Sequence, residues 1–161
     1  YVLSEFAMGL DNLAHFYQIP KSETEKKIAA AINEQFQFPT EIIPYIVSSD
    51  EKLTNQFRGD NVYSGITATS SGFYGPQGRQ LRIPTKYTQL NDHLSEFYYD
   101  GYQVLNFEME SSAIYGLGKL LGHECLSVNV VVANRVTQQY SKDGEAAVEK
   151  MIEKALEVLM G

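Results

Sequence analysis

The sequence contains a single cysteine, Cys125, and no tryptophan. One cysteine cannot form a disulfide within the chain, whereas small secreted domains depend on several disulfides to stabilise a limited core. The scarcity of cysteine therefore favours a protein of the reducing cytoplasm. Cys125 has apolar neighbours in the sequence, which predicts a buried, inert thiol instead of a catalytic nucleophile.

Basic residues are also scarce. Lys and Arg together number 13 against 20 Asp and Glu, which gives a net charge of −7 at pH 7. Nucleic acids and anionic membranes attract basic surfaces, because binding releases counterions from their negative charges. The sequence also lacks an apolar run long enough to cross a bilayer. These absences argue against nucleic acid and membrane as partners and favour a small molecule.

Motifs of common cofactor sites and catalytic centres are missing as well. G-x-G-x-x-G, the P-loop, H-E-x-x-H and G-x-S-x-G are all absent. His15, His93 and His123 lack the spacing of metal ligands, so we expect no metal site and structural or surface roles for them. The chain starts at Tyr1 without an initiator Met, and we expect its beginning to be missing.

A length of 161 residues favours one domain, spanning 1–161. Strands are expected at 42–47, as an edge strand or extended segment interrupted by Pro44, at 62–69, at 104–107 and, buried in the sheet centre, at 126–133. Helices are expected from the Ser22–Glu25 capping box towards Pro39, at 111–121 before a Gly122 C-cap, and at 144–160, with a polar loop at 55–60.

Strands that alternate with helices predict an α/β fold, in which ligands bind where strands end. Polar clusters that begin at Phe73, Glu108 and Asn134 each follow an expected strand. We therefore expect any function to come from these clusters.

The first cluster combines an aromatic ring, Phe73, with the amide of Gln77 and the guanidinium of Arg79. A pyrimidine-dione offers an N–H flanked by two carbonyls. Gln77 can accept from that N–H and donate to one carbonyl, while Arg79 donates to the other. The alternative is a turn-rich surface loop, made by its Gly and Pro residues, with an incidental Gln and Arg.

The second cluster is Glu108-Met109-Glu110, between an expected strand and a helix. Carboxylates there are favoured by the free N–H groups of the first helical turn, so capping alone can explain them. Two acidic groups around a methionine also suit a ribose, whose hydroxyls need acceptors and whose carbon face needs an apolar contact. The residues alone leave both interpretations open.

The third cluster starts with Asn134-Arg135, directly after the 126–133 run. Arg135 would emerge at a sheet edge, where its guanidinium needs an acceptor. An exposed loop is the alternative interpretation.

Taken in order, F-Y-x-x-Q-x-R from Phe73, E-M-E-S from Glu108 and N-R-x-T-Q-Q from Asn134 resemble the uridine phosphorylases, a nucleoside phosphorylase family. The similarity extends over roughly 61–160. The resemblance implies a mixed central sheet flanked by helices, of which this chain is the C-terminal portion. It implies a uracil site of Phe73, Gln77, Arg79, Arg135, Val132 and Ala133, and a ribose site of Glu108, Met109 and Glu110.

The reaction implied by the resemblance is attack of inorganic phosphate on the anomeric carbon of uridine, releasing uracil and ribose 1-phosphate. Gln77 and Arg79 would be the catalytic residues, because donors aimed at the uracil carbonyls stabilise the charge on the leaving base. Phosphate is then a co-substrate and no cofactor is needed. The resemblance also implies a homo-oligomer, either a dimer or a hexamer.

The sequence departs from the family pattern because it lacks the Gly-rich loop and the arginines that hold phosphate. We expect them in a missing N-terminal part, so the 161 residues alone should not catalyse phosphorolysis. Purine phosphorylases and methylthioadenosine-type nucleosidases are rivals, but they place an Asp where this chain reads Val-Ala-Asn-Arg at 132–135. A non-catalytic nucleoside-binding protein and a purely structural α/β domain are further alternatives.

Overall fold

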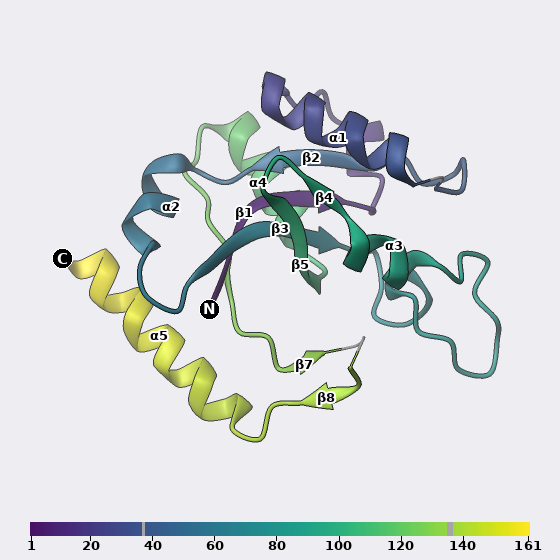
Figure 1. Ribbon diagram of the computed structural model, residues 1–161. Helices are drawn as coiled ribbons and strands as arrows, with labels where there is room; N and C mark the ends of the chain where they lie inside the picture. The colour runs from purple at the N-terminus through teal and green to yellow at the C-terminus, as the bar shows by residue number, and fades with distance from the viewer. Residues whose placement is uncertain (37, 135–136) are drawn as a thin grey trace.

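The computed structural model describes residues 1–36, 38–134 and 137–161. Its strands are β1 (Val2–Gly9), β2 (Tyr45–Ser48), β3 (Tyr63–Thr69), β4 (Tyr98–Tyr99), β5 (Tyr102–Glu108), β6 (Val128–Asn129), β7 (Ala133–Asn134) and β8 (Gln139–Tyr140). Its helices are α1 (Glu23–Gln35), α2 (Glu51–Phe57), α3 (Leu90–Glu96), α4 (Ser111–Leu121) and α5 (Gly144–Met160), with 3-10 turns η1 (Leu13–His15) and η2 (Gly75–Gln77). In Figure 1, α1 lies above the strands, whereas α5 and the β7–β8 hairpin lie below them.

The main sheet is mixed, as the resemblance implied, with the strand order β2-β1-β3-β5-β4. β1, β3 and β5 run parallel, while β2 pairs antiparallel with β1 and β4 antiparallel with β5. β2 is the expected edge strand and begins directly after Pro44. Because the central strands are parallel, their carboxyl ends meet at one edge of the sheet.

Apolar side chains pack on both faces of this sheet. On one face, Phe6, Met8 and Ile66 pack with residues of α1 and α3. On the other face, Ala7 packs in a cluster that includes Tyr115 of α4. β1 contributes to both clusters and is therefore a central, doubly covered strand. The α/β prediction, with helices flanking a central sheet, is confirmed.

Helices whose ends carry local signals form where they were expected. At the start of α1, the Ser22 hydroxyl accepts from the N–H of Glu25, and the Glu25 carboxylate accepts from the N–H of Ser22. α4 ends before Gly122, which adopts a φ of 75°. α5 covers 144–160 and contacts α2.

The predicted polar loop at 55–60 is wrong in its first half, because α2 extends to Phe57. Asp50 caps this helix by accepting the N–H of Leu53 at 2.9 Å. The buried Thr54 donates its hydroxyl to the Asp50 carbonyl at 2.8 Å. So short a helix, with little of its surface buried, leaves a weak periodic signal in the sequence.

The predicted central strand at 126–133 is also wrong, because only β6 and the start of β7 are strands there. β6 runs antiparallel to β1 and pairs Asn129 with Val2, the first residue of β1. Residues after Asn129 therefore run past the start of β1 and lose it as a partner. Val131 and Val132 are 45% and 49% exposed instead of buried.

Candidate functional site

The loops that follow β3 and β5 meet at the carboxyl edge of the sheet, facing the β7–β8 hairpin. A cleft of about 750 Å³ lies between these loops and the hairpin. The cleft is lined by all the predicted site residues that the structure describes: Phe73, Gln77, Arg79, Glu108, Met109, Glu110, Val132 and Ala133. Arg135 lies outside the described residues. The topology thus brings together side chains that lie up to 60 positions apart in the chain, Phe73 and Ala133 being the extremes.

The loop after β3 is closed by its own backbone. The N–H groups of Gln77 and Arg79 both donate to the Tyr74 carbonyl, at 3.1 and 3.0 Å. Gly78 stands between them with a φ of +69°, and a Cβ there would lie 2.7 Å from Asn91 Nδ2. The turn therefore requires glycine at this position. Gln77, 2% exposed, and Arg79 are consequently presented from a fixed turn.

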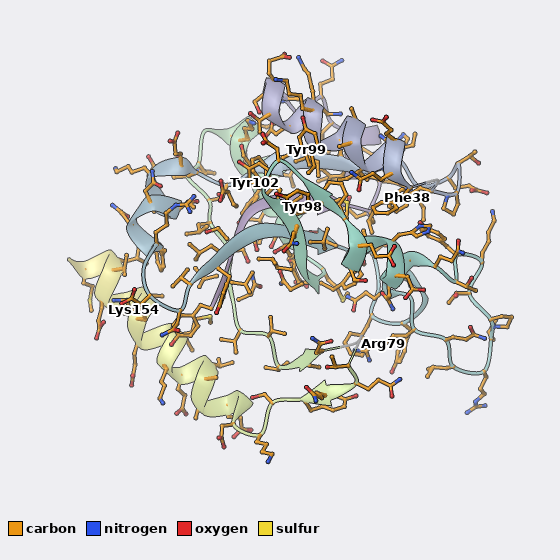
Figure 2. The ribbon with its side chains drawn as sticks, in the orientation of Figure 1. Phe38, Arg79, Tyr98, Tyr99, Tyr102 and Lys154 are labelled. Carbon is orange, nitrogen blue, oxygen red and sulfur yellow. The ribbon has the colours of Figure 1, made fainter. Side chains whose placement is uncertain are left out.

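Arg79 stacks on the aromatic ring of the same loop. Its guanidinium carbon lies 3.8 Å from the centroid of the Phe73 ring. In Figure 2, Arg79 lies in the space between α3 and the β7–β8 hairpin, and residues of both elements line the cleft. A cation over a ring face is attracted by the ring quadrupole, which orients the planar fork of donors.

Glu108, at the end of β5, is committed to protein hydrogen bonds. One carboxylate oxygen accepts from the hydroxyl of Thr69, and the other accepts the N–H groups of Glu110 and Ser111 at 2.7 and 2.6 Å. Glu108 therefore caps α4, and the capping interpretation holds for this residue. Of the three-residue segment, Met109 is 41% exposed and Glu110 is exposed, so both present surface to the cleft.

A polar network anchors the start of α4 to the end of β3, to Asp11 after β1 and to the start of β2. The N–H of Ser112 donates to the Thr69 hydroxyl at 2.9 Å, and the Ser112 hydroxyl donates to Asp11 at 2.7 Å. Tyr45 donates to the other oxygen of Asp11 at 2.9 Å. Burial, with the nearby Asp11 charge, raises the pKa of Tyr45 well above its usual range, so its hydroxyl stays a donor.

The residues directly before the third predicted cluster, together with Tyr140, supply an apolar wall to the cleft. Val132 is half-exposed, and its carbonyl accepts the N–H of Ser141 at 2.9 Å, which joins the two sides of the β7–β8 hairpin. Tyr140, on the second strand of the hairpin, is 82% exposed and also lines the cleft. Exposed apolar groups gathered at a concave surface are typical of ligand sites.

Several cleft residues were missed at the sequence level: Asn91, Asn106, Phe107, Asn129 and Tyr140. Asn106 accepts from the Thr67 hydroxyl at 2.6 Å, and Asn129 donates to the Ser4 hydroxyl at 2.9 Å. Phe107 and Asn106 adjoin Glu108 on β5, and this adjacency was a usable signal. The position of Asn91 depends on how α3 packs, which no local pattern encodes.

The histidines and the acidic groups do not form a metal centre in the described part of the chain. No group of three or more His, Cys, Asp or Glu side chains is placed there to hold an ion. His93 accepts or donates at Nδ1 to the Tyr87 hydroxyl and stacks on Phe36, with ring centroids 4.9 Å apart. His93 thus packs between Phe36 and Tyr87, as a structural role requires.

A second hollow, of about 780 Å³, lies between α5 and the start of β1, and none of the predicted site residues is among its lining residues. Among residues 1–36, 38–134 and 137–161, no helix has both the length and the apolar character needed to span a bilayer.

The half-buried Cys125 is not the fully buried thiol that was expected, but burial does raise the pKa of its thiol.

The sequence is similar to curated uridine phosphorylases. It is 34% identical over 104 residues to that of Thermococcus kodakarensis, covering 63% of this chain and 36% of the relative. It is 31% identical over 103 residues to that of Haemophilus influenzae, covering 64% of this chain and 40% of the relative. The segment of this chain that matches thus spans well under half the length of each of these two relatives.

Solved structures resemble the fold over nearly the whole chain. A Trypanosoma brucei nucleoside phosphorylase, described as showing uridine phosphorylase activity, aligns with a TM-score of 0.87 and 27% identity over 99% of this chain and 57% of its own. Isoform 2 of the Schistosoma mansoni uridine phosphorylase aligns with a TM-score of 0.58 and 22% identity, over 99% and 53%, and supports the fold alone. The sequence profile of the phosphorylase superfamily matches residues 4–160. This match takes in the sheet, the cleft and α5 together, and the chain therefore belongs to the phosphorylase superfamily.

Proposed function

We propose that this chain carries the nucleoside site of a uridine phosphorylase, an enzyme that uses inorganic phosphate to cleave uridine into uracil and ribose 1-phosphate. The observation that carries the proposal is the single cleft that gathers Phe73, Gln77 and Arg79 with Met109 and Glu110. The names of the similar proteins support the same reaction.

Uracil is assigned to the closed turn after β3. The Gln77 amide would accept the ring N–H and donate to one carbonyl, and Arg79 would donate to the other. Phe73, already stacked under the guanidinium, provides an apolar face for the base or sugar. Val132 and Ala133 contribute apolar lining to the cleft, and Arg135 is assigned to the same proposed uracil site.

Ribose is assigned to the segment that leads into α4. Glu110 offers a carboxylate to the sugar hydroxyls, and Met109 offers an apolar contact to the sugar carbons. Glu108 supports the segment by capping the helix. Base and sugar are thereby held by two loops from neighbouring parallel strands, β3 and β5.

Catalysis would be electrostatic. As the glycosidic bond breaks, negative charge grows on uracil and positive charge on the sugar. Donors fixed in advance at the uracil carbonyls stabilise that charge without reorganisation, which is the role we propose for Gln77 and Arg79. Phosphate is the co-substrate, no cofactor takes part, and phosphate is bound by residues outside these 161.

The wider setting follows from the same proposal. A role in pyrimidine nucleoside salvage in the cytoplasm suits a chain with one cysteine and a net charge of −7. Partners would be the nucleoside, phosphate and further copies of the protein in a dimer or hexamer.

The proposal is tested with the full-length protein that contains this chain. Uridine, inosine and methylthioadenosine are supplied separately, with and without phosphate, and the released bases and sugar phosphate are quantified. We expect uracil and ribose 1-phosphate in equal amounts, only with phosphate. A preference for inosine, or cleavage of methylthioadenosine by water, would indicate a purine enzyme, and uridine binding without turnover would indicate a non-catalytic relative.

A further inference from the structure

Thr69 lies between the two segments that carry the proposed nucleoside site, which are the loop after β3 and the Glu108–Glu110 segment at the end of β5. It is the last residue of β3, its side chain is fully buried, and the loop that carries Phe73 starts directly after it. Its carbonyl accepts the N–H of Leu10 at 2.9 Å, which ties it to the end of β1. Thr69 does not line the cleft itself, so any effect on a ligand must pass through other residues.

The Thr69 hydroxyl joins β5 to α4. It donates its one proton to the carboxylate of Glu108 and accepts the N–H of Ser112 at 2.9 Å. A hydroxyl that bridges a carboxylate and a backbone N–H has little freedom to rotate, because each partner fixes one direction. Hydrogen bonds to a carboxylate are the stronger kind, and this one is partly buried.

Glu108 connects Thr69 to the backbone of the segment that contains Met109 and Glu110. With one oxygen held by Thr69, its other oxygen accepts the N–H groups of Glu110 and Ser111. These bonds set the turn on which Met109 and Glu110 stand. The backbone adds a parallel link, since the N–H of Ser70 donates to the Glu108 carbonyl at 3.0 Å.

Thr67, two residues earlier on the same strand, provides the internal comparison. Its side chain is equally buried, but its hydroxyl bonds Ser4 and Asn106 and does not reach α4. Thr67 thus reaches the cleft wall through Asn106 but makes no bond to the Met109–Glu110 segment or to α4. The connection to Glu108 and Ser112 is specific to Thr69.

We propose that Thr69 is a positioning residue that sets the sugar-contact segment Met109–Glu110 relative to the base loop by orienting Glu108. This inference rests on the proposed function, because it assigns a role within that nucleoside site. Loss of the hydroxyl should weaken nucleoside binding more than the chemical step, since Thr69 does not line the cleft and acts only through Glu108 and Ser112.

The test compares steady-state kinetics of Thr69→Val and Thr69→Ser in the full-length protein. Valine keeps the shape without the hydroxyl, and we expect the KM for uridine to rise about tenfold, with kcat changed less than about threefold, as for loss of one buried hydrogen bond to a charged group. The KM for phosphate should not change. Serine keeps the hydroxyl and should restore the KM for uridine to near the wild-type value.

Thr54→Val is the matched control, because Thr54 is also buried and hydrogen bonded through its hydroxyl but lies on α2, outside the cleft lining. It should lower the melting temperature and leave the KM for uridine unchanged. A wild-type KM in Thr69→Val, or an equal rise in Thr54→Val, would overturn the positioning role. Failure of the wild-type protein to release uracil would overturn the proposed function itself, a result distinct from either.

Discussion

Arg79 holds its guanidinium carbon 3.8 Å above the centre of the Phe73 ring, within one closed turn. Stacking on the ring fixes the plane of the guanidinium donors before any ligand arrives. The turn fixes the backbone position of Arg79, because the Arg79 N–H donates to the Tyr74 carbonyl. Preorganised donors lose little freedom when charge develops on a ligand. In the proposed nucleoside site, the pair would therefore tie base recognition to stabilisation of the leaving group.

Replacing Arg79 by lysine should lower kcat/KM for uridine about 100-fold, because lysine keeps the charge but loses the planar fork and its stacking. Steady-state kinetics of the full-length protein measure this change. Arg82→Lys is the control, since Arg82 is exposed in the same loop region and does not line the cleft. Equal activities of the two variants would argue against a role for the guanidinium.

Glu108→Gln tests the carboxylate that caps α4. An amide keeps the shape but offers only one acceptor oxygen, so the bonds to Thr69, Glu110 and Ser111 cannot all persist. We expect the free energy of unfolding to fall by about 1–2 kcal/mol and the KM for uridine to rise. Denaturant unfolding measures the loss of stability, and steady-state kinetics measures the KM. Glu124→Gln is the control, because it removes the same charge from an exposed residue.

The parts of the fold that the sequence predicted are those set by residues close together along the chain. Ser22 with Glu25 marks the start of α1 and Gly122 the end of α4 through partners within a few residues, so these helices were predicted. β1 was missed because it is buried on both faces and shows no alternation. The 126–133 run was misjudged because its pairing ends where β1 begins, at Val2.

The candidate site divides in the same way. Phe73, Gln77 and Glu108 were found because ligand-binding side chains gather where parallel strands end, and strand ends are visible in the sequence. Asn91 could not be found, because only the packing of α3 places it beside Gly78. The contact of Glu108 with Thr69 likewise joins segments far apart in the chain, and the sequence does not show it.

Gly78→Ala probes the turn between Gln77 and Arg79. Gly78 and Gly101 both have positive φ, but a Cβ at Gly78 meets the Asn91 amide at 2.7 Å, whereas Gly101 has no atom within 4 Å. Backbone strain should cost each alanine variant about 1–2 kcal/mol of unfolding free energy. Only Gly78→Ala should also raise the KM for uridine, because it displaces Asn91 in the cleft wall.

Combining Gly78→Ala with Asn91→Ala separates these causes. Removing the amide relieves the close contact but leaves the φ of +69° unchanged. Gly78→Ala should lose more unfolding free energy than Gly101→Ala, because it adds the contact with Asn91 to the backbone strain. The double variant should recover part of this additional loss. No recovery would show that backbone strain alone limits this position.

Glu25 links α1, β2 and α4, and it should make stability depend on pH. Its side chain is fully buried, and it accepts from Lys119 Nζ at 2.9 Å and from the Ser48 N–H at 2.7 Å. Burial alone would raise the pKa of Glu25, but these donors outweigh burial and hold the pKa below its ordinary value of 4.5. A lowered pKa stabilises the folded state above the unfolded-state pKa, and this stabilisation is lost as pH falls through the folded-state value.

Glu25→Gln should therefore lower the free energy of unfolding by about 2 kcal/mol at pH 7, and the difference from wild type should shrink as pH falls below the ordinary carboxyl pKa of 4.5. Urea unfolding between pH 7 and pH 3 measures both quantities. Glu23→Gln is the control, because the pKa of Glu23 is lowered by Lys26 but its carboxylate is exposed, so screening by solvent should leave little effect. A difference for Glu25→Gln that stays constant with pH would mean that lost packing, not the buried charge pair, accounts for the change.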